Sequence, residues 1–285
     1  MANLKEIRNR IASVSSTMQI TSAMKMVSAA KLKKAQDAIT AMRPYSDTLT
    51  DLLQSLSGSI ESSDASKYAA VREENKILLV AITSNRGLCG AFNTNVIKQA
   101  QHLAKEAYAG KEVSVMAVGK KSADILGKNF PLVSNESAIY EDLSFANVSE
   151  IADRLMNDFA TEKFDKIVLI YNKFKNAATQ IVTTEQFLPI VPVIGAAAES
   201  DYIFEPGKAE IVSELVPKAL KTQLFKGIRD SFASEHGARM TAMHKATDNA
   251  TDLRDQLKLT YNKARQAAIT NEILEIVGGA EALND

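Results

Sequence analysis

Several absences limit what this 285-residue chain can be. It has a single cysteine, Cys89, so an internal disulfide is impossible and a reducing compartment is expected. It has no run of about 18 apolar residues, so we expect no membrane-crossing segment and a membrane link only through a partner. Its formal net charge is zero, so no global field favours nucleic acid as a partner. The first ten residues, MANLKEIRNR, lack the apolar core of a signal peptide, and no cleaved signal is expected.

The usual marks of chemistry are also missing. His102, His236 and His244 do not pair at helical spacing, and one cysteine cannot complete a metal-ligand set. There is no G-x-S-x-G nucleophile motif and no Gly-Lys-Ser/Thr phosphate loop. We therefore expect no catalytic residue, no cofactor-binding residue and no metal ligand in this chain.

Proline and glycine are absent from residues 1–43, and no proline follows Pro217, so both ends of the chain can form long helices. The first of these helices has an apolar seam with the alternating three- and four-residue spacing of a heptad: Leu4, Ile7, Ile11, Val14 and Met18. The pattern resumes beyond Pro44, which predicts a kinked helix over residues 1–57. The second helix is expected over residues 209–285, with Pro217 in the first turn of its long part.

Between these helices, apolar runs alternate with amphipathic segments. Strands are expected at 76–83, 112–119, 166–174 and 179–190. Helices are expected at 93–110, 120–129 and 147–164, the last with Asn147 as its N-cap. This alternation predicts a largely parallel, helix-covered sheet over residues 75–200, preceded by a linker at 58–74. The expected fold class is α/β: a long antiparallel coiled coil of the N- and C-terminal helices, with a central Rossmann-like α/β domain.

The two long helices are expected to pair antiparallel, because neither can leave its apolar seam in water. The turn positions place Met24 opposite a residue near 250, and Arg265 and Gln266 near the N-terminus. The C-terminal helix is longer by about ten residues, so its last turns should project as a single helix.

The apolar seam breaks in residues 19–36. The heptad register places Thr21, Lys25 and Ser28 in the seam, while small apolar residues cover several other faces. A helix that is apolar on several faces is buried on several faces, which two helices cannot provide. Another protein is therefore expected around this stretch, with a poorly patterned coiled coil as the alternative. The same reasoning predicts an enclosed apolar tip at Ile269, Ile273, Ile276 and Val277.

Positive charge is concentrated near the N-terminus. Residues 1–45 carry eight Lys or Arg against Glu6 and Asp37, so the rest of the neutral chain carries the balancing negative charge. Lys25, Lys31, Lys33 and Lys34 flank the apolar stretch, and like charges this close favour an acidic partner. A solvated charged face is the alternative.

The stretch SNRGLCGAFN, residues 84–93, places a glycine turn after a strand. Two glycines three residues apart are weak evidence for a phosphate site and are typical of a tight strand-to-helix connection. Arg86 is compatible with an anion site and Cys89 with a reactive thiol, although a single cysteine in such a turn is usually only small and buried. A nucleotide enzyme built on the middle domain is thus one further hypothesis.

Four segments together resemble a known family. They are KEIRNRIASVSSTMQITSAMKMVSAAKL, SNRGLCGAFN, SEHGARMTAMHKATDNA and YNKARQAAITNEILEIVGGAEAL, and they resemble the γ subunit of F-type ATP synthases, in its bacterial form. The last segment has that family's I-T-x-E-x-x-E-x-x-x-G-A pattern, at Ile269, Thr270, Glu272, Glu275, Gly279 and Ala280.

The resemblance implies a central rotor shaft that couples proton-driven rotation of a c-subunit ring to ATP synthesis or hydrolysis at β subunits. The implied partners are three α and three β subunits, an ε subunit and the c ring. Nucleotides bind to α and β, so this chain would be a non-catalytic subunit. The implied location is peripheral, on the cytoplasmic face of a bacterial cell membrane.

The resemblance also assigns contact residues. Those for a β subunit are Met24, Lys25, Lys31, Arg265 and Gln266, and those for the c ring are Tyr202, Phe204 and Glu205. A static coiled-coil scaffold or a nucleic-acid-gripping arm is the alternative function. An arm of the second kind needs basic residues at its tip, whereas this tip is apolar.

Overall fold

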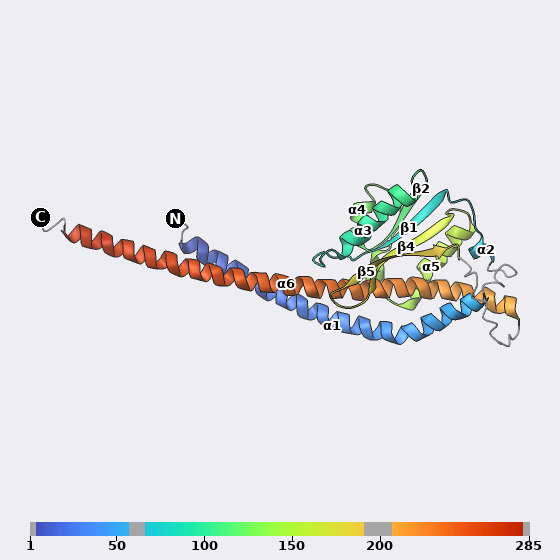
Figure 1. Cartoon of the computed structure of the whole chain (residues 1–285), viewed down its shortest axis with the longest axis horizontal. Coiled ribbons are helices and arrows are strands. Elements are labelled where there is room, and N and C mark those ends of the chain that lie inside the picture. Colours follow the sequence, from blue (N-terminus) through green and yellow to red (C-terminus); the bar gives the residue numbers. More distant parts are fainter. Residues whose placement is uncertain (1–3, 57–65, 191–206, 282–285) are drawn as a thin grey trace. The chain divides into compact units, whose positions relative to one another are not determined.

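The computed structural model describes residues 4–56, 66–190 and 207–281 (Figure 1). It divides into two compact units: Met1–Val27 with Met240–Asp285, and Ser28–Arg239. This division differs from the predicted domain boundaries, because the inner parts of both long helices belong to the same unit as the sheet.

The two long helices are present as predicted. Helix α1 spans Leu4–Leu56 and helix α6 spans Lys208–Glu281. Pro44 lies inside α1, which bends in its light-blue part (Figure 1). Pro217 lies inside α6 rather than in a first turn, so that prediction was wrong. Burial of Val216 and Leu220 beside it offsets the cost of an interior proline, about 3 kcal/mol.

A five-stranded sheet forms the centre of the second unit. Its strands are β1 (Lys76–Ile82), β2 (Glu112–Val118), β3 (Leu132–Asn135), β4 (Lys166–Phe174) and β5 (Gln180–Leu188). The order is β3-β2-β1-β4-β5, and only the β4–β5 pairing is antiparallel. The predicted largely parallel sheet is confirmed, although β3 was missed because its apolar run is too short to give a periodic signal.

Helices cover both faces of this sheet (Figure 1). On one face lie α3 (Phe92–His102), extended by a π-helical turn at Leu103–Ala107, and α4 (Lys120–Leu126). On the other lie α5 (Phe145–Ala160) and the first part of α6. β1 is buried on both faces, which explains why its sequence is a continuous apolar run.

Two local predictions need correction. Ser144, not Asn147, is the N-cap of α5, because its extended backbone lets its hydroxyl accept from the Asn147 N–H at 3.3 Å. The predicted linker contains a short helix, α2 (Ser66–Ala69). Tyr68 packs there against the core, and its carbonyl accepts from the Ile190 N–H at 2.9 Å.

In the first unit, α1 and α6 pair antiparallel as predicted. The Arg8 guanidinium donates to the Tyr261 hydroxyl at 2.7 Å, and the hydroxyls of Thr21 and Thr247 lie 2.8 Å apart. The predicted register, with residue 24 near 250, is displaced by a few residues. That register took residues 57 and 217 as the facing ends of the two helices, whereas α6 continues through Pro217 back to Lys208.

Gly119 is the tightest glycine contact of the described fold. Its φ is +117°, and an added Cβ would lie 2.2 Å from the Thr83 carbonyl oxygen. We expect Gly119→Ala to lower the free energy of unfolding by roughly 3 kcal/mol, measured by urea denaturation. Gly110, at φ +79° with nothing within 4 Å of an added Cβ, is the matched control, and Gly110→Ala should cost only about 1 kcal/mol. Equal losses would contradict the steric argument.

Candidate protein interface

The outer face of α1 exposes apolar side chains. Ile20 is 60% exposed, Met26 64% and Val27 57%. Large exposed apolar groups that lie close together usually mark a surface for another protein. This agrees with the expectation that the stretch over residues 19–36 needs a partner.

The seam itself is not interrupted, which corrects the sequence interpretation. Thr21 and Ser28 remain buried at their heptad positions. Thr21 satisfies its hydroxyl within the helix pair, since it donates to the Met18 carbonyl at 3.1 Å and contacts the Thr247 hydroxyl. Small polar groups therefore line the inside of the helix pair, while larger apolar groups lie outside.

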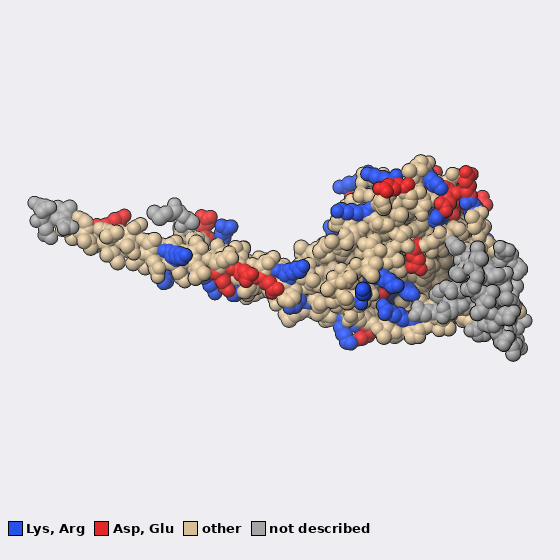
Figure 2. All heavy atoms as spheres, viewed as in Figure 1, with Lys and Arg blue, Asp and Glu red and all other residues tan. Residues whose placement is uncertain are grey.

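The last turns of α6 form the second part of this surface. Every residue from 265 to 280 is exposed. The large apolar side chains there are about half exposed or more: Ile269, Ile273, Leu274, Ile276 and Val277. Figure 2 shows mostly uncharged atoms on the visible face of these turns. The residues predicted as an apolar tip thus lie together on an unpartnered part of the helix, within the described chain.

The predicted β-contact residues fall on separate segments. Met24 and Lys25 are half-buried on α1, and Lys31 is exposed further along that helix. Arg265 and Gln266 are exposed at the start of the tip. Tyr202, Phe204 and Glu205, predicted to contact the c ring, lie outside the described residues. Leu259 on α6 is also an exposed apolar residue, and the sequence did not identify it as part of this surface. Its only signal in the sequence is that it lies off the apolar seam.

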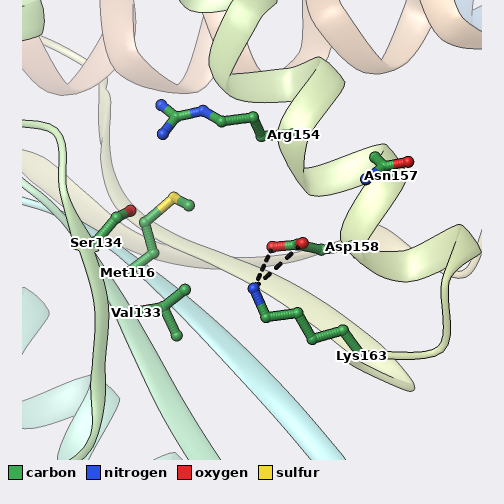
Figure 3. Close-up of a pocket in the computed structure, with 7 residues that line it drawn as sticks. All are labelled: Met116, Val133, Ser134, Arg154, Asn157, Asp158 and Lys163. Carbon is green, nitrogen blue, oxygen red and sulfur yellow. Dashed lines mark hydrogen bonds and ion pairs between the residues drawn. The ribbon is translucent and has the colours of Figure 1, made fainter.

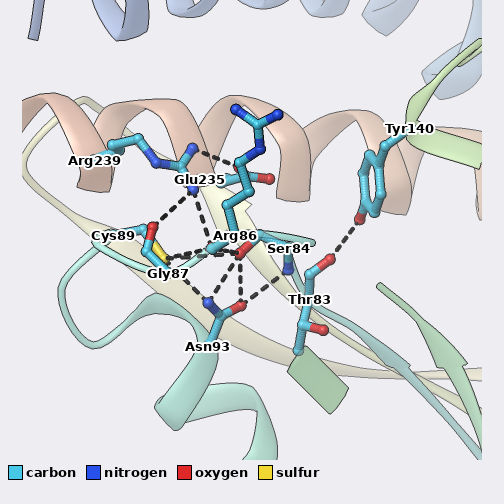
Figure 4. Close-up of polar contacts among 9 residues, drawn as sticks. All are labelled: Thr83, Ser84, Arg86, Gly87, Cys89, Asn93, Tyr140, Glu235 and Arg239. Atoms are coloured by element: carbon cyan, nitrogen blue, oxygen red, sulfur yellow. Dashed lines mark hydrogen bonds and ion pairs between the residues drawn. The ribbon is translucent and has the colours of Figure 1, made fainter. Parts of the chain in front are cut away.

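The glycine turn between β1 and α3 is held from inside (Figure 4). Ser84 donates its hydroxyl to the Arg86 carbonyl at 2.6 Å, and its N–H donates to the Asn93 side chain at 2.9 Å. Leu88 and Gly90 both have positive φ, as a tight turn requires. Burial raises the pKa of the Cys89 thiol, which makes it a poor nucleophile.

Arg239 of α6 fixes this turn to the helix (Figure 4). Its guanidinium donates to the carbonyls of Arg86 and Gly87, at 3.2 and 3.3 Å, and pairs with Glu235. A phosphate site would present backbone N–H groups to a ligand, whereas here turn carbonyls bind a buried cation. The geometry favours the interpretation of a structural connection.

Two further features bear on other functions. Among the described residues, no group of three or more His, Cys, Asp or Glu is placed to hold a metal ion. Within the same residues, no helix is long and apolar enough to span a bilayer.

An α/β domain whose terminal helices expose an apolar surface defines a class: a coiled-coil subunit of a larger assembly. The family model described as ATP synthase matches residues 3–283. The ATP synthase gamma chain of Flavobacterium johnsoniae is 70% identical over 286 residues, covering 100% of both chains. That of a Geobacter species is 45% identical and covers 99% of each chain. The chain therefore belongs to the ATP synthase gamma chain family.

Solved structures share the fold. A chain of the Euglena gracilis mitochondrial ATP synthase, from a structure of OSCP, F1 and the c-ring, matches with a TM-score of 0.70 at 23% identity, covering 98% of this chain and 94% of that one. A chain of the Tetrahymena thermophila mitochondrial ATP synthase, from a structure of the central stalk and c-ring, matches with a TM-score of 0.61 at 25% identity, covering 80% of this chain and 99% of that one.

His236 of α6 gives the second unit a pH-dependent stability. The ring is buried, both nitrogens lack hydrogen-bond partners among the described residues, and the Phe232 ring lies edge-on with centroids 4.6 Å apart. Burial, followed by the charges of Arg239 and Lys31, lowers its pKa to about 3. His236 therefore binds up to one more proton in the unfolded than in the folded chain between pH 6.5 and 3, and its contribution to stability falls as the pH falls through that window.

We expect His236→Leu to leave stability near pH 7 unchanged or higher, because an apolar side chain suits this site. Between pH 7 and 5, the parent chain should lose about 2 kcal/mol more free energy of unfolding than this variant. Urea denaturation at both pH values measures the difference. His244, which is exposed, provides the control variant His244→Leu. Parallel losses in the parent and His236→Leu would show that His236 does not carry the effect.

Proposed function

We propose that this chain is the central rotor shaft of an F-type ATP synthase, coupling proton-driven rotation of a c ring to ATP synthesis or hydrolysis at β subunits. The observation that carries the proposal is the exposed apolar end of α6, on a chain that belongs to the gamma chain family. Such an end needs an apolar sleeve, which a ring of other subunits provides.

The arrangement of side chains on this end suits a rotating part. At 100° per residue, the five large apolar side chains of the tip fall within an arc of about 160°. Glu272 and Glu275 fall on the remaining arc. One helix therefore presents an apolar side and an acidic side, and turning it presents different chemistry to each surrounding subunit in turn.

The proposed partners are three α and three β subunits around the helices, an ε subunit and the c ring. Family membership supports this set, as does the likeness to a chain from the Tetrahymena structure of a central stalk and c-ring. We further propose that the chain is peripheral, on the cytoplasmic face of a bacterial membrane, and that it has no catalytic site, because nucleotides bind to α and β.

We assign β-subunit contacts to two levels. Met24, Lys25 and Lys31 on α1 form one, and the basic charge there favours an acidic β loop. Arg265 and Gln266 on α6 form the other. The planar guanidinium of Arg265 fits one carboxylate in a two-point contact, so it holds a single β subunit at a time.

We expect Arg265→Ala to lower the ATP turnover of the assembled complex by up to about tenfold, through loss of one charged hydrogen bond. Lys263→Ala, at an exposed neighbouring position, should leave turnover unchanged. The isolated chain should hydrolyse no ATP in the same assay. Unchanged turnover and assembly in Arg265→Ala would remove this residue from the contact, and hydrolysis by the isolated chain would refute its non-catalytic role.

Cross-linking tests the rotor proposal itself. A cysteine placed at position 265, and one in the facing β loop, should join this chain to one β subunit per complex and stop steady turnover. Cross-links to all three β subunits of one complex, or continued turnover after cross-linking, would defeat the proposal.

Tyr202 and Phe204 test the c-ring contact. Two aromatic residues within three positions of Glu205 in the sequence suit an interface anchor. We expect Tyr202→Ala combined with Phe204→Ala to abolish ATP-driven proton pumping in membrane vesicles while ATP hydrolysis continues. Tyr45→Ala, at an exposed aromatic of α1, is the control and should pump normally. Normal pumping by the double variant would rule out this assignment.

A further inference from the structure

A hollow of about 210 Å³ lies between α5 and the β2–β3 edge of the sheet (Figure 3). Met116 and Val133 provide its apolar floor. Arg154, Asn157 and Asp158 share one face of α5 above it, at helical spacing, and Lys163 follows the helix. No residue of this hollow has a part in the proposed function, so a ligand bound there would be independent of that function.

A β-bulge shapes the floor. Val115 pairs with Leu132 and Met116 pairs with Ser134, so Val133 is an extra residue on β3. Adjacent residues of a regular strand point to opposite faces, but a bulge re-aims them. Both Val133 and Ser134 therefore line the same hollow. Bulges of this kind are often associated with functional sites.

The Ser134 hydroxyl is the polar group that needs a partner. Its oxygen is buried, and it has no hydrogen bond among the described residues. In Figure 3 it points into the hollow, on the side where the Arg154 side chain extends. A buried hydroxyl without a partner is costly, and a bound molecule that accepts a hydrogen bond from it removes that cost.

Two cations at the rim set the charge of that molecule. Arg154 pairs with Glu136 at 2.9 Å, and Lys163 pairs with Asp158 at 3.3 Å. Both cations are about half exposed, at 54% of each side chain, whereas Glu136 and Asp158 are only 17% and 22% exposed. The exposed side of each cation can therefore bind a further anion without displacing its carboxylate partner. The side chains lining the hollow carry one more positive than negative charge, and Glu136, which pairs with Arg154 from outside the lining, balances it.

We propose that this hollow binds a small organic anion. Its carboxylate or phosphate group lies between Arg154 and Lys163 and accepts from the Ser134 hydroxyl. Its short apolar part lies on Met116 and Val133. The polar rim and apolar floor are the features that small-molecule sites combine.

The test uses the full chain labelled with ¹³C at its methionine methyl groups. The Met116 signal, identified by its loss in Met116→Leu, reports binding at the floor. We expect isobutyrate or inorganic phosphate to shift the Met116 signal saturably, with a Kd near or below about 1 mM. A response to isobutyrate identifies the bound group as a carboxylate, and a response to phosphate identifies it as a phosphate. Isobutyramide, which has the same shape as isobutyrate without the charge, should not shift it.

Variants locate the contact. Arg154→Gln, Lys163→Gln and Ser134→Ala should each weaken binding by about tenfold. Asp158→Asn removes the neighbouring carboxylate and should tighten binding. Lys98→Gln, at an exposed lysine away from the hollow, is the control. No saturable shift with either anion, equal binding of isobutyramide, or equal affinity in all variants would show that the hollow holds only water.

Discussion

The enclosure of one stretch of α6, residues 222–239, is the constraint on which the second unit depends. Its apolar side chains, such as Leu224 and Ile228, complete the core on one face of the sheet. Several of its polar side chains find partners within the fold, although both ring nitrogens of His236 have none among the described residues. The Ser234 hydroxyl donates to the Asn172 carbonyl at 2.9 Å, and Arg239 binds the glycine turn. The turn that resembles a ligand loop is thereby used to satisfy a buried helix.

The first unit distributes its side chains in the opposite way. Thr21 is buried in the helix pair, while Ile20 and Met26 are exposed. For an isolated coiled coil this arrangement sacrifices stability, because polar seam residues contribute less than apolar ones. It becomes favourable only when other chains cover the outside. The helix pair therefore has a sequence suited to an assembly, which agrees with its family.

The long elements were predictable because each repeats one signal many times. The apolar run of β4 gave its bounds correctly, and the heptad of α1 identified the helix despite Pro44. The failures were local or depended on distant contacts. The cap of α5 depended on the backbone of Ser144, and the helix through Pro217 depended on packing that no local pattern shows. The bulge at Val133, which creates the proposed anion site, has no sequence signal because it arises from the register between two strands.

The charge of the tip separates the rotor proposal from a nucleic-acid-gripping arm. No Lys or Arg follows Arg265 in the sequence, whereas Glu272 and Glu275 do. Nucleic-acid affinity depends on cations that displace the counterions of phosphates, so this end would be repelled by a phosphate backbone. An apolar sleeve has no such conflict, because the acidic arc can face a solvated side while the apolar arc is covered.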